Sequence, residues 1–180
     1  MSRWTTARLA AAVAGVLAFL AGAASLGRRR LRRGRGGRMD IKEIARRLIE
    51  EPWRGKLDEV LELVGEDAVA HVAGSPAPLT GRDGFREFVT TYLTAFPDGT
   101  ITVQDQIAEG DMVATRWTGR GTNTGELIGL PPTGRQITIE GVSYARITDD
   151  KVRETWITWD TLALMQQLGA VPETIPAQTS

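Results

Sequence analysis

Asp160 is the side chain in this sequence best placed for acid–base chemistry. It ends the last predicted strand and, by strand alternation, shares a face with Trp156. Among apolar neighbours a carboxylate loses hydration and holds a proton more readily, which suits a general acid or base. The alternative is structural, because an aspartate directly before a helix at Thr161 would cap that helix. The two roles can coexist.

His71 and Glu140 are the next candidates for proton transfer. His71 is the single histidine of the chain, and it follows an apolar stretch from which it could face a cavity as a proton carrier or as a donor to a substrate carbonyl. A structural histidine with one hydrogen bond is the alternative. Glu140 is either a second acid or an ion-pair partner across strands for Arg146 or Arg116.

The side chains expected to line a ligand pocket come from three predicted strands. Alternation places Trp156 with Glu154, Thr158 and Asp160, and it places Tyr144 with Glu140, Val142 and Arg146. Faces that mix aromatic rings with a few charges suit a pocket that is apolar with a few placed polar groups. The predicted substrate-binding residues are Trp117, Asn123, Glu140, Tyr144, Arg146 and Trp156. The alternatives are core packing for the two tryptophans and a loop cap for Asn123.

Several kinds of site are not expected. One histidine with scattered acids lacks the spacing of a metal site, and the glycine-rich segments do not follow a phosphate-loop pattern. The chain has no cysteine, so disulfides and thiolate chemistry are excluded. No Ser/His/Asp arrangement stands out. We therefore expect chemistry without a cofactor or a metal.

The charge is distributed unevenly along the 180 residues. The first 38 residues hold nine arginines and no acid, whereas residues 39–180 hold 13 basic and 22 acidic residues. A domain with this acidic excess is not expected to bind nucleic acid.

The N-terminal segment, residues 1–38, has three interpretations. Leu9–Gly27 is an uncharged run of 19 residues, which as a helix would reach about 28 Å, close to the bilayer core of about 30 Å. With the arginines that follow, this predicts a membrane anchor that keeps the domain in the cytoplasm. Ala21-Gly22-Ala23 instead fits a signal peptide. If translation starts at Met39, the segment is a spurious extension and the protein is cytoplasmic.

Hydrophobic spacing predicts the elements that position these side chains. Helical spacing occurs at residues 41–49, 57–64 and 83–96, and a short closing helix is expected at Thr161–Leu168. A short strand is expected at 69–73. After Thr100 the apolar period becomes two, which predicts an antiparallel meander of four strands ending at Asp160. This order predicts an α+β domain over residues 39–170, followed by a disordered tail at 171–180.

Five runs of residues occur in an order found in one known family. They are Phe96–Asp98, Ala108–Ala114, Arg116–Glu126, Gly129–Arg135 and Trp156–Gly169. Through them the chain resembles, over about residues 40–170, the SnoaL-like polyketide cyclases (ester cyclases) of the nuclear transport factor 2-like superfamily. The resemblance implies a cone-shaped, curved antiparallel sheet wrapped with about three helices around an apolar cavity. It also implies a homodimer formed through the outer face of the sheet.

The resemblance further implies a reaction. Cyclases of the family use an aspartate as acid and base in an intramolecular aldol closure, and Asp160 occupies the matching strand end. Two positions depart from the pattern: Asn123 replaces a frequent histidine, and His71-Val72-Ala73 lacks a usual proline. We expect either a cyclase-like or isomerase-like enzyme acting on a small hydrophobic carbonyl compound, or a non-catalytic ligand-binding or interaction module of the same fold.

Overall fold

The computed structural model describes residues 39–172, all within one compact unit. Within these residues, four α-helices and one 3₁₀ helix accompany six strands, which confirms the α+β class. The helices are α2 (Ile41–Glu50), η1 (Glu51–Arg54), α3 (Leu57–Leu61), α4 (Gly81–Ala95) and α5 (Thr161–Leu168). The strands are β1 (Val64–Val72), β2 (Leu79–Thr80), β3 (Thr100–Glu109), β4 (Met112–Thr122), β5 (Gln136–Thr148) and β6 (Lys151–Trp159).

The six strands form one sheet in the order β2-β1-β6-β5-β4-β3. The meander from β3 to β6 is antiparallel, as expected. β1, however, pairs with β6 in parallel, so the prediction of a wholly antiparallel sheet is wrong and the sheet is mixed. The first long strand lies beside the last because the chain crosses over through α4 and the meander, a long-range pairing that local patterns do not reveal.

Local chemistry explains where the elements begin and end. Asp40 caps α2 by accepting a hydrogen bond from the Lys42 backbone N–H, and Gly55 ends η1 in a left-handed conformation. In the turn between β5 and β6, Asp149 and Asp150 both have positive φ, as the type I′ hairpin turn requires. The second helix is shorter than predicted over 57–64. Helix α3 stops at Leu61, and Val64 already belongs to β1.

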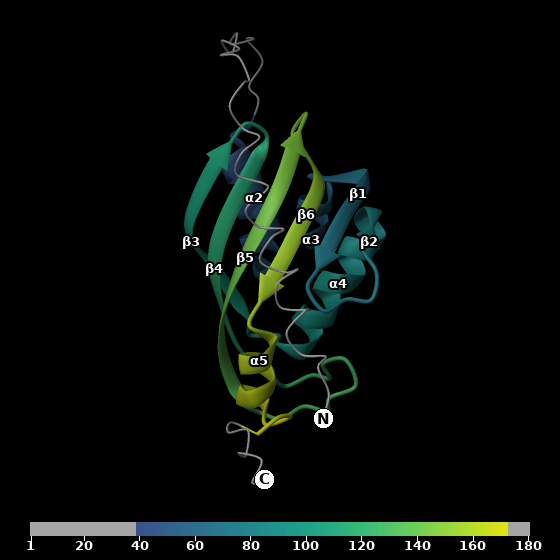
Figure 1. Ribbon diagram of the computed structural model, residues 1–180. Coiled ribbons are helices and arrows are strands. Elements are labelled where there is room, and N and C mark those ends of the chain that lie inside the picture. The colour runs from purple at the N-terminus through teal and green to yellow at the C-terminus, as the bar shows by residue number, and fades with distance from the viewer. Residues whose placement is uncertain (1–38, 173–180) are drawn as a thin grey trace, which may run out of the picture. The chain divides into compact units, whose positions relative to one another are not determined.

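Helices α2, α3 and α4 lie together over one face of the sheet, which we call the inner face (Figure 1). The hydrophobic core lies between these helices and the inner face, with buried aliphatic side chains such as Ile44 and Val60 from the helices and Val113 from β4. Glu50 fastens the end of α2 to the sheet edge, because its buried carboxylate accepts a hydrogen bond of 2.8 Å from the Val103 backbone N–H. We call the opposite face of the sheet the outer face.

The expected membrane anchor requires correction. Across residues 39–172, no helix is long and apolar enough to span a bilayer. This finding does not support the prediction of a membrane-anchored protein with a cytoplasmic domain, and we do not retain it. The hydrophobic helix expected at residues 9–27 and the last residues of the expected tail, 173–180, lie outside the described part of the chain.

Candidate functional site

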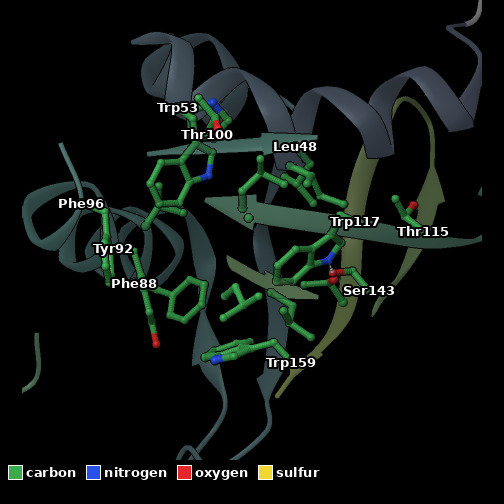
Figure 2. Close-up of a pocket in the computed structure, with 18 of the residues that line it drawn as sticks. Leu48, Trp53, Phe88, Tyr92, Phe96, Thr100, Thr115, Trp117, Ser143 and Trp159 are labelled. Atoms are coloured by element: carbon green, nitrogen blue, oxygen red, sulfur yellow. Dashed lines mark hydrogen bonds between the residues drawn. The ribbon is translucent and has the colours of Figure 1, made fainter. Parts of the chain in front are cut away.

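A cavity lies between the inner face of the sheet and the helices that cover it (Figure 2). It contains about 1020 Å³ of empty space, counted with its opening to solvent. Nearly all of its lining is apolar, and the aromatic residues of that lining are Trp53, Phe85, Phe88, Tyr92, Phe96, Trp117 and Trp159.

Strand register explains why the two tryptophans of the sheet face this cavity. Trp117 of β4 pairs with Gly141 of β5, which in turn pairs with Trp159 of β6, so the three residues form one row on the inner face. The neighbouring row contains Thr115, Ser143 and Ile157, which also line the cavity. The sheet therefore supplies a wall in which a glycine separates two indole rings.

Trp117 is held in place by a hydrogen bond. Its Nε1 donates to Ser143 Oγ over 2.9 Å, and only 5% of the residue is exposed (Figure 2). A buried indole N–H needs a partner, and Ser143 supplies one from the adjacent strand. Trp117 thus presents a ring to the cavity, with its polar atom already satisfied.

An aromatic wall of the cavity combines Phe88 and Tyr92 of α4 with Trp159 of β6 (Figure 2). Tyr92 lies 5.2 Å from Phe88 and 5.7 Å from Trp159 between ring centroids. Burial in this apolar wall raises the pKa of Tyr92 to about 12. Its hydroxyl is therefore a neutral hydrogen-bond donor at physiological pH, and it makes no hydrogen bond with the other described residues.

Trp159 carries a polar atom that lacks a partner. Its Nε1 is the one buried side-chain nitrogen or oxygen within residues 39–172 that has no hydrogen bond. An unsatisfied buried donor costs about 1–3 kcal/mol, and such groups are rare in folded proteins. Together with the Tyr92 hydroxyl, this indole N–H gives the aromatic wall two donors and no carboxylate.

The structure brings four predicted site residues together around Glu154, but on the outer face. His71, Trp156 and Tyr144 form one row across β1, β6 and β5. His71 stacks on Trp156 with ring centroids 5.4 Å apart, and the Arg146 guanidinium lies 5.8 Å from the Trp156 ring. Glu154 binds both flanking groups, with 3.0 Å to His71 Nε2 and 3.0 Å to Arg146 Nη1. None of these residues lines the cavity.

A β-bulge in β6 explains why Trp156, which was predicted in the pocket, lies on the outer face. Arg146 pairs with Glu154, but the next residue, Ile147, pairs with Val152, so Arg153 is an extra residue in β6. Beyond the bulge the alternation is inverted, which turns Thr155, Ile157 and Trp159 to the cavity. Unbroken alternation, which groups Trp156 with Glu154, Thr158 and Asp160, predicts Trp156 in the pocket, and the bulge overturns this prediction.

The remaining predicted residues have separate locations. Glu140 is exposed on the outer face of β5, directly opposite Thr118. Asn123 is fully buried and organises the loop after β4: its Oδ1 accepts from the Thr133 backbone N–H over 2.8 Å, and its Nδ2 donates to the Gly125 carbonyl. This geometry matches the loop-cap alternative. Trp117 is the predicted residue that does line the cavity.

Asp160 follows Trp159 but does not itself line the cavity. Its Oδ1 accepts a hydrogen bond of 2.8 Å from the Ala163 backbone N–H, so it caps α5. The residue is exposed, and the apolar surroundings that we expected for its carboxylate are not found. The helix that it caps contributes Leu164 to the cavity wall.

Two features bear on cofactors. Within residues 39–172, no group of three or more His, Cys, Asp or Glu side chains is arranged to hold a metal ion. The cavity lining contains one charged side chain, Arg120, and that residue is largely exposed. The site is therefore suited to enclosing an apolar molecule and offering hydrogen bonds to its oxygen atoms.

Sequence reasoning missed most of the aromatic lining. Phe88 and Tyr92 lie on the helix predicted over 83–96, but they are not among the predicted site residues. Thr155, Ile157 and Trp159 have the opposite parity to the apolar Val152, so alternation alone did not place them on the cavity face. Trp53 lies in a short 3₁₀ helix, where no periodicity points to a cavity.

Comparison with known families shows to which protein family the chain belongs. A family model described as SnoaL-like polyketide cyclase matches residues 42–168. The chain belongs to this family. The matched segment contains the six strands and all of the helical residues that line the cavity of this SnoaL-like protein.

Curated relatives and a solved structure agree with this assignment. The chain is 30% identical to aklanonic acid methyl ester cyclase DnrD of Streptomyces peucetius over 71% of this chain and 89% of that protein. It is 28% identical to nogalonic acid methyl ester cyclase of Streptomyces nogalater over 64% and 87%. Wild-type IdmH of Streptomyces antibioticus superposes with a TM-score of 0.64 at 34% identity, covering 73% of this SnoaL-like chain and 99% of IdmH.

Proposed function

We propose that this protein is a cofactor-independent, cyclase-like enzyme that encloses a small hydrophobic carbonyl compound in the cavity. The observation that carries the proposal is the aromatic wall of Phe88, Tyr92 and Trp159, which combines apolar surface with two unpaired hydrogen-bond donors. Carbonyl oxygens accept such bonds, and a donor in a dry site stabilises the negative charge that an enolate develops on oxygen. The inner face of the sheet and the helices that cover it would form the cone that the family resemblance implies.

The reaction that fits is an intramolecular aldol closure. A base removes a proton from a carbon next to a carbonyl group, and the resulting enolate carbon forms a bond to a second carbonyl carbon of the same molecule. The alkoxide formed then takes up a proton, so the ring closes with no net gain or loss of atoms. No oxidant, reductant or metal is consumed, and the protein must supply enclosure, orientation and proton transfer.

Asp160 remains our candidate for the proton transfer. It directly follows Trp159, and its Oδ1 is used by the cap on α5, whereas no described residue donates a hydrogen bond to Oδ2. A substrate that fills the cavity and reaches the end of β6 would meet this second oxygen. If a bound substrate shields Asp160 from solvent, proton transfer would be favoured further.

A ligand-binding module without catalysis is the second candidate. One observation favours it: the residues that line the cavity include no carboxylate and no imidazole. In this case the same donors and rings hold a ligand, and Asp160 serves as a helix cap alone. The fold supports both functions, so the chemistry must decide between them.

Incubation with two compounds separates the candidates. The relatives are named for aklanonic acid methyl ester and nogalonic acid methyl ester, so these two esters are the first substrates to test. Mass spectrometry after chromatography would detect an isomeric ring-closed product. Product formed by the wild type and lost in Asp160→Asn supports the enzyme and its base. Saturable binding without product supports the module, and neither binding nor product contradicts both.

We further propose that the protein forms a homodimer through the outer face of the sheet. That face exposes apolar and aromatic side chains, with Tyr144 47% and Ile107 73% exposed in one row across the strands. Light scattering after size-exclusion chromatography tests this, with Tyr144→Glu as the disrupting variant. A monomeric wild type at micromolar concentration would contradict the proposal.

A further inference from the structure

Trp117 lies directly against the backbone of Gly141. A methyl group placed on Gly141 would stand 2.2 Å from Trp117 Cζ2, 2.5 Å from Cη2 and 2.7 Å from Cε2. These three atoms belong to the six-membered ring of the indole, which therefore covers the Gly141 Cα. Contacts shorter than about 3.0 Å do not occur at a real Cβ, so any other residue would force the ring to move.

Backbone conformation does not explain this glycine. Gly141 is absent from the described glycines with positive φ, and it sits in the middle of β5 with regular partners on both sides. Glycine in the interior of a strand is unfavourable, because it loses more conformational entropy on folding than other residues and offers no side chain to pack. Its place here is consistent with a close approach from a neighbouring group, and that group is the Trp117 ring.

The direction of any displacement follows from the surrounding contacts. The Trp117 ring has the β5 backbone on one side and the cavity on the other, and its Nε1 is tethered to Ser143 on the same strand. A side chain at Gly141 would lift the ring away from the strand, and the empty space on that path is the cavity. The row continues to Trp159, so the lifted ring would also narrow the gap between the two indoles.

We propose that Gly141 is a positioning residue that sets the width of the cavity through Trp117 and thereby the size of ligand that the protein accepts. This inference rests on the proposed function, because it concerns the ligand held in the same cavity. The ligand class is a flat, multi-ring compound: the lining is dominated by aromatic side chains, which recognise flat rings by stacking or edge contacts.

Gly119 provides a matched control on the same face. It also lines the cavity, but a methyl group there would lie 3.4 Å from Ile139 Cγ1 and 3.7 Å from Ile101 Cγ1, which are ordinary contacts. Gly119→Ala thus adds the same atoms to the same wall without displacing a tryptophan. Gly99 under Trp53 is unsuitable as a second test, because its added methyl group would also meet the Phe96 carbonyl oxygen at 2.8 Å.

The experiment uses two fluorescent probes that differ by one ring, 1-aminonaphthalene and 1-aminoanthracene, titrated into the full chain. We expect the wild type to bind both. In Gly141→Ala the three-ring probe should lose about 10-fold or more in affinity, the effect expected when a pocket wall moves in by about a methylene group. The two-ring probe should change by less than about 3-fold, and Gly119→Ala should not discriminate between the probes to this extent.

A second variant keeps the test decisive if Gly141→Ala folds poorly. Trp117→Phe removes the ring atoms that the new methyl group would meet. In a Trp117→Phe background, Gly141→Ala should therefore leave folding and the affinity for the three-ring probe equal to those of Trp117→Phe alone. Equal losses for both probes, no loss, or no rescue in the double variant would overturn the inference while leaving the proposed function intact. A wild type that binds neither probe would overturn this inference, and the proposed function falls with it if the two methyl esters also fail to bind.

Discussion

Trp159 of β6 meets Tyr92 of α4 edge to face, with ring centroids 5.7 Å apart and ring planes at 85°. This contact joins the last strand of the sheet to the helix that covers it. Both residues line the cavity, and the indole nitrogen of Trp159 is buried without a partner. The cavity wall thus combines a stable aromatic contact with polar atoms that protein groups leave unsatisfied.

Alkaline titration tests the environment of Tyr92. Burial raises its pKa to about 12, above the ordinary value of about 10, so the folded state favours the neutral phenol. The stability due to this group is fully present below pH ~10 and is lost as pH rises towards ~12. Tyrosinate absorbance should show one late-titrating phenol that Tyr92→Phe removes. Complete ionisation of all tyrosines near pH ~10 in the folded protein would contradict this environment.

Ser143→Ala should destabilise the protein by leaving a donor unpaired. The variant removes the acceptor of the 2.9 Å bond from Trp117 Nε1, which is buried. We expect a loss of about 1–3 kcal/mol in the free energy of unfolding, measured by urea denaturation. Ser75→Ala is the control, because the Ser75 hydroxyl bonds to the Ala77 carbonyl at an exposed site, and it should change stability by less than about 0.5 kcal/mol. Equal effects of the two variants would show that Trp117 does not depend on Ser143.

Asp98 should contribute stability that depends on acid pH. Its two carboxylate oxygens each accept a hydrogen bond of 2.7 Å from Thr122, one from the backbone N–H and one from the hydroxyl. These bonds, the backbone one first, lower the pKa of Asp98. A lowered folded-state pKa gives stability that is present above the unfolded value of about 3.9 and lost as pH falls through the folded value.

The corresponding variant is Asp98→Asn. Its urea midpoint should lie below that of the wild type at neutral pH, and the difference should shrink as the solution is acidified below pH ~4. Thr122→Val, which removes the hydroxyl donor but keeps the backbone N–H, should show part of the same effect. A difference between wild type and Asp98→Asn that stays constant with pH would contradict the assignment.

Local patterns predicted most elements of this fold and the family, but not the composition of the site. Helix spacing, glycines and turn aspartates mark element ends because they act within a few residues. The parallel pairing of β1 with β6 is a long-range contact, and the extra residue Arg153 inverts the alternation of β6 without any sign in its side-chain pattern. Because of this one bulge, Trp159 lines the cavity, whereas the sequence predicts Trp156 there.

Two substitutions at Asp160 separate its structural role from a chemical one. Asp160→Ala removes the cap on α5 and should cost about 1 kcal/mol, whereas Asp160→Asn retains most of the capping ability. If Asp160 transfers the proton, Asp160→Asn should lower turnover by about 10² to 10⁴ while thermal stability stays near that of the wild type. Turnover in Asp160→Asn equal to that of the wild type would exclude the catalytic role.

The most direct test of the account fills the cavity from one strand. Ile157 lines the cavity, and its neighbour Thr158 is exposed on the outer face, so Ile157→Trp and Thr158→Trp add an indole to adjacent positions on opposite faces. The measurement is the dissociation constant for 1-aminoanthracene, with circular dichroism to confirm folding of both variants. The account predicts that Ile157→Trp weakens binding about 100-fold or more, whereas Thr158→Trp binds as the wild type does. Equal binding by both folded variants would show that the ligand site lies elsewhere.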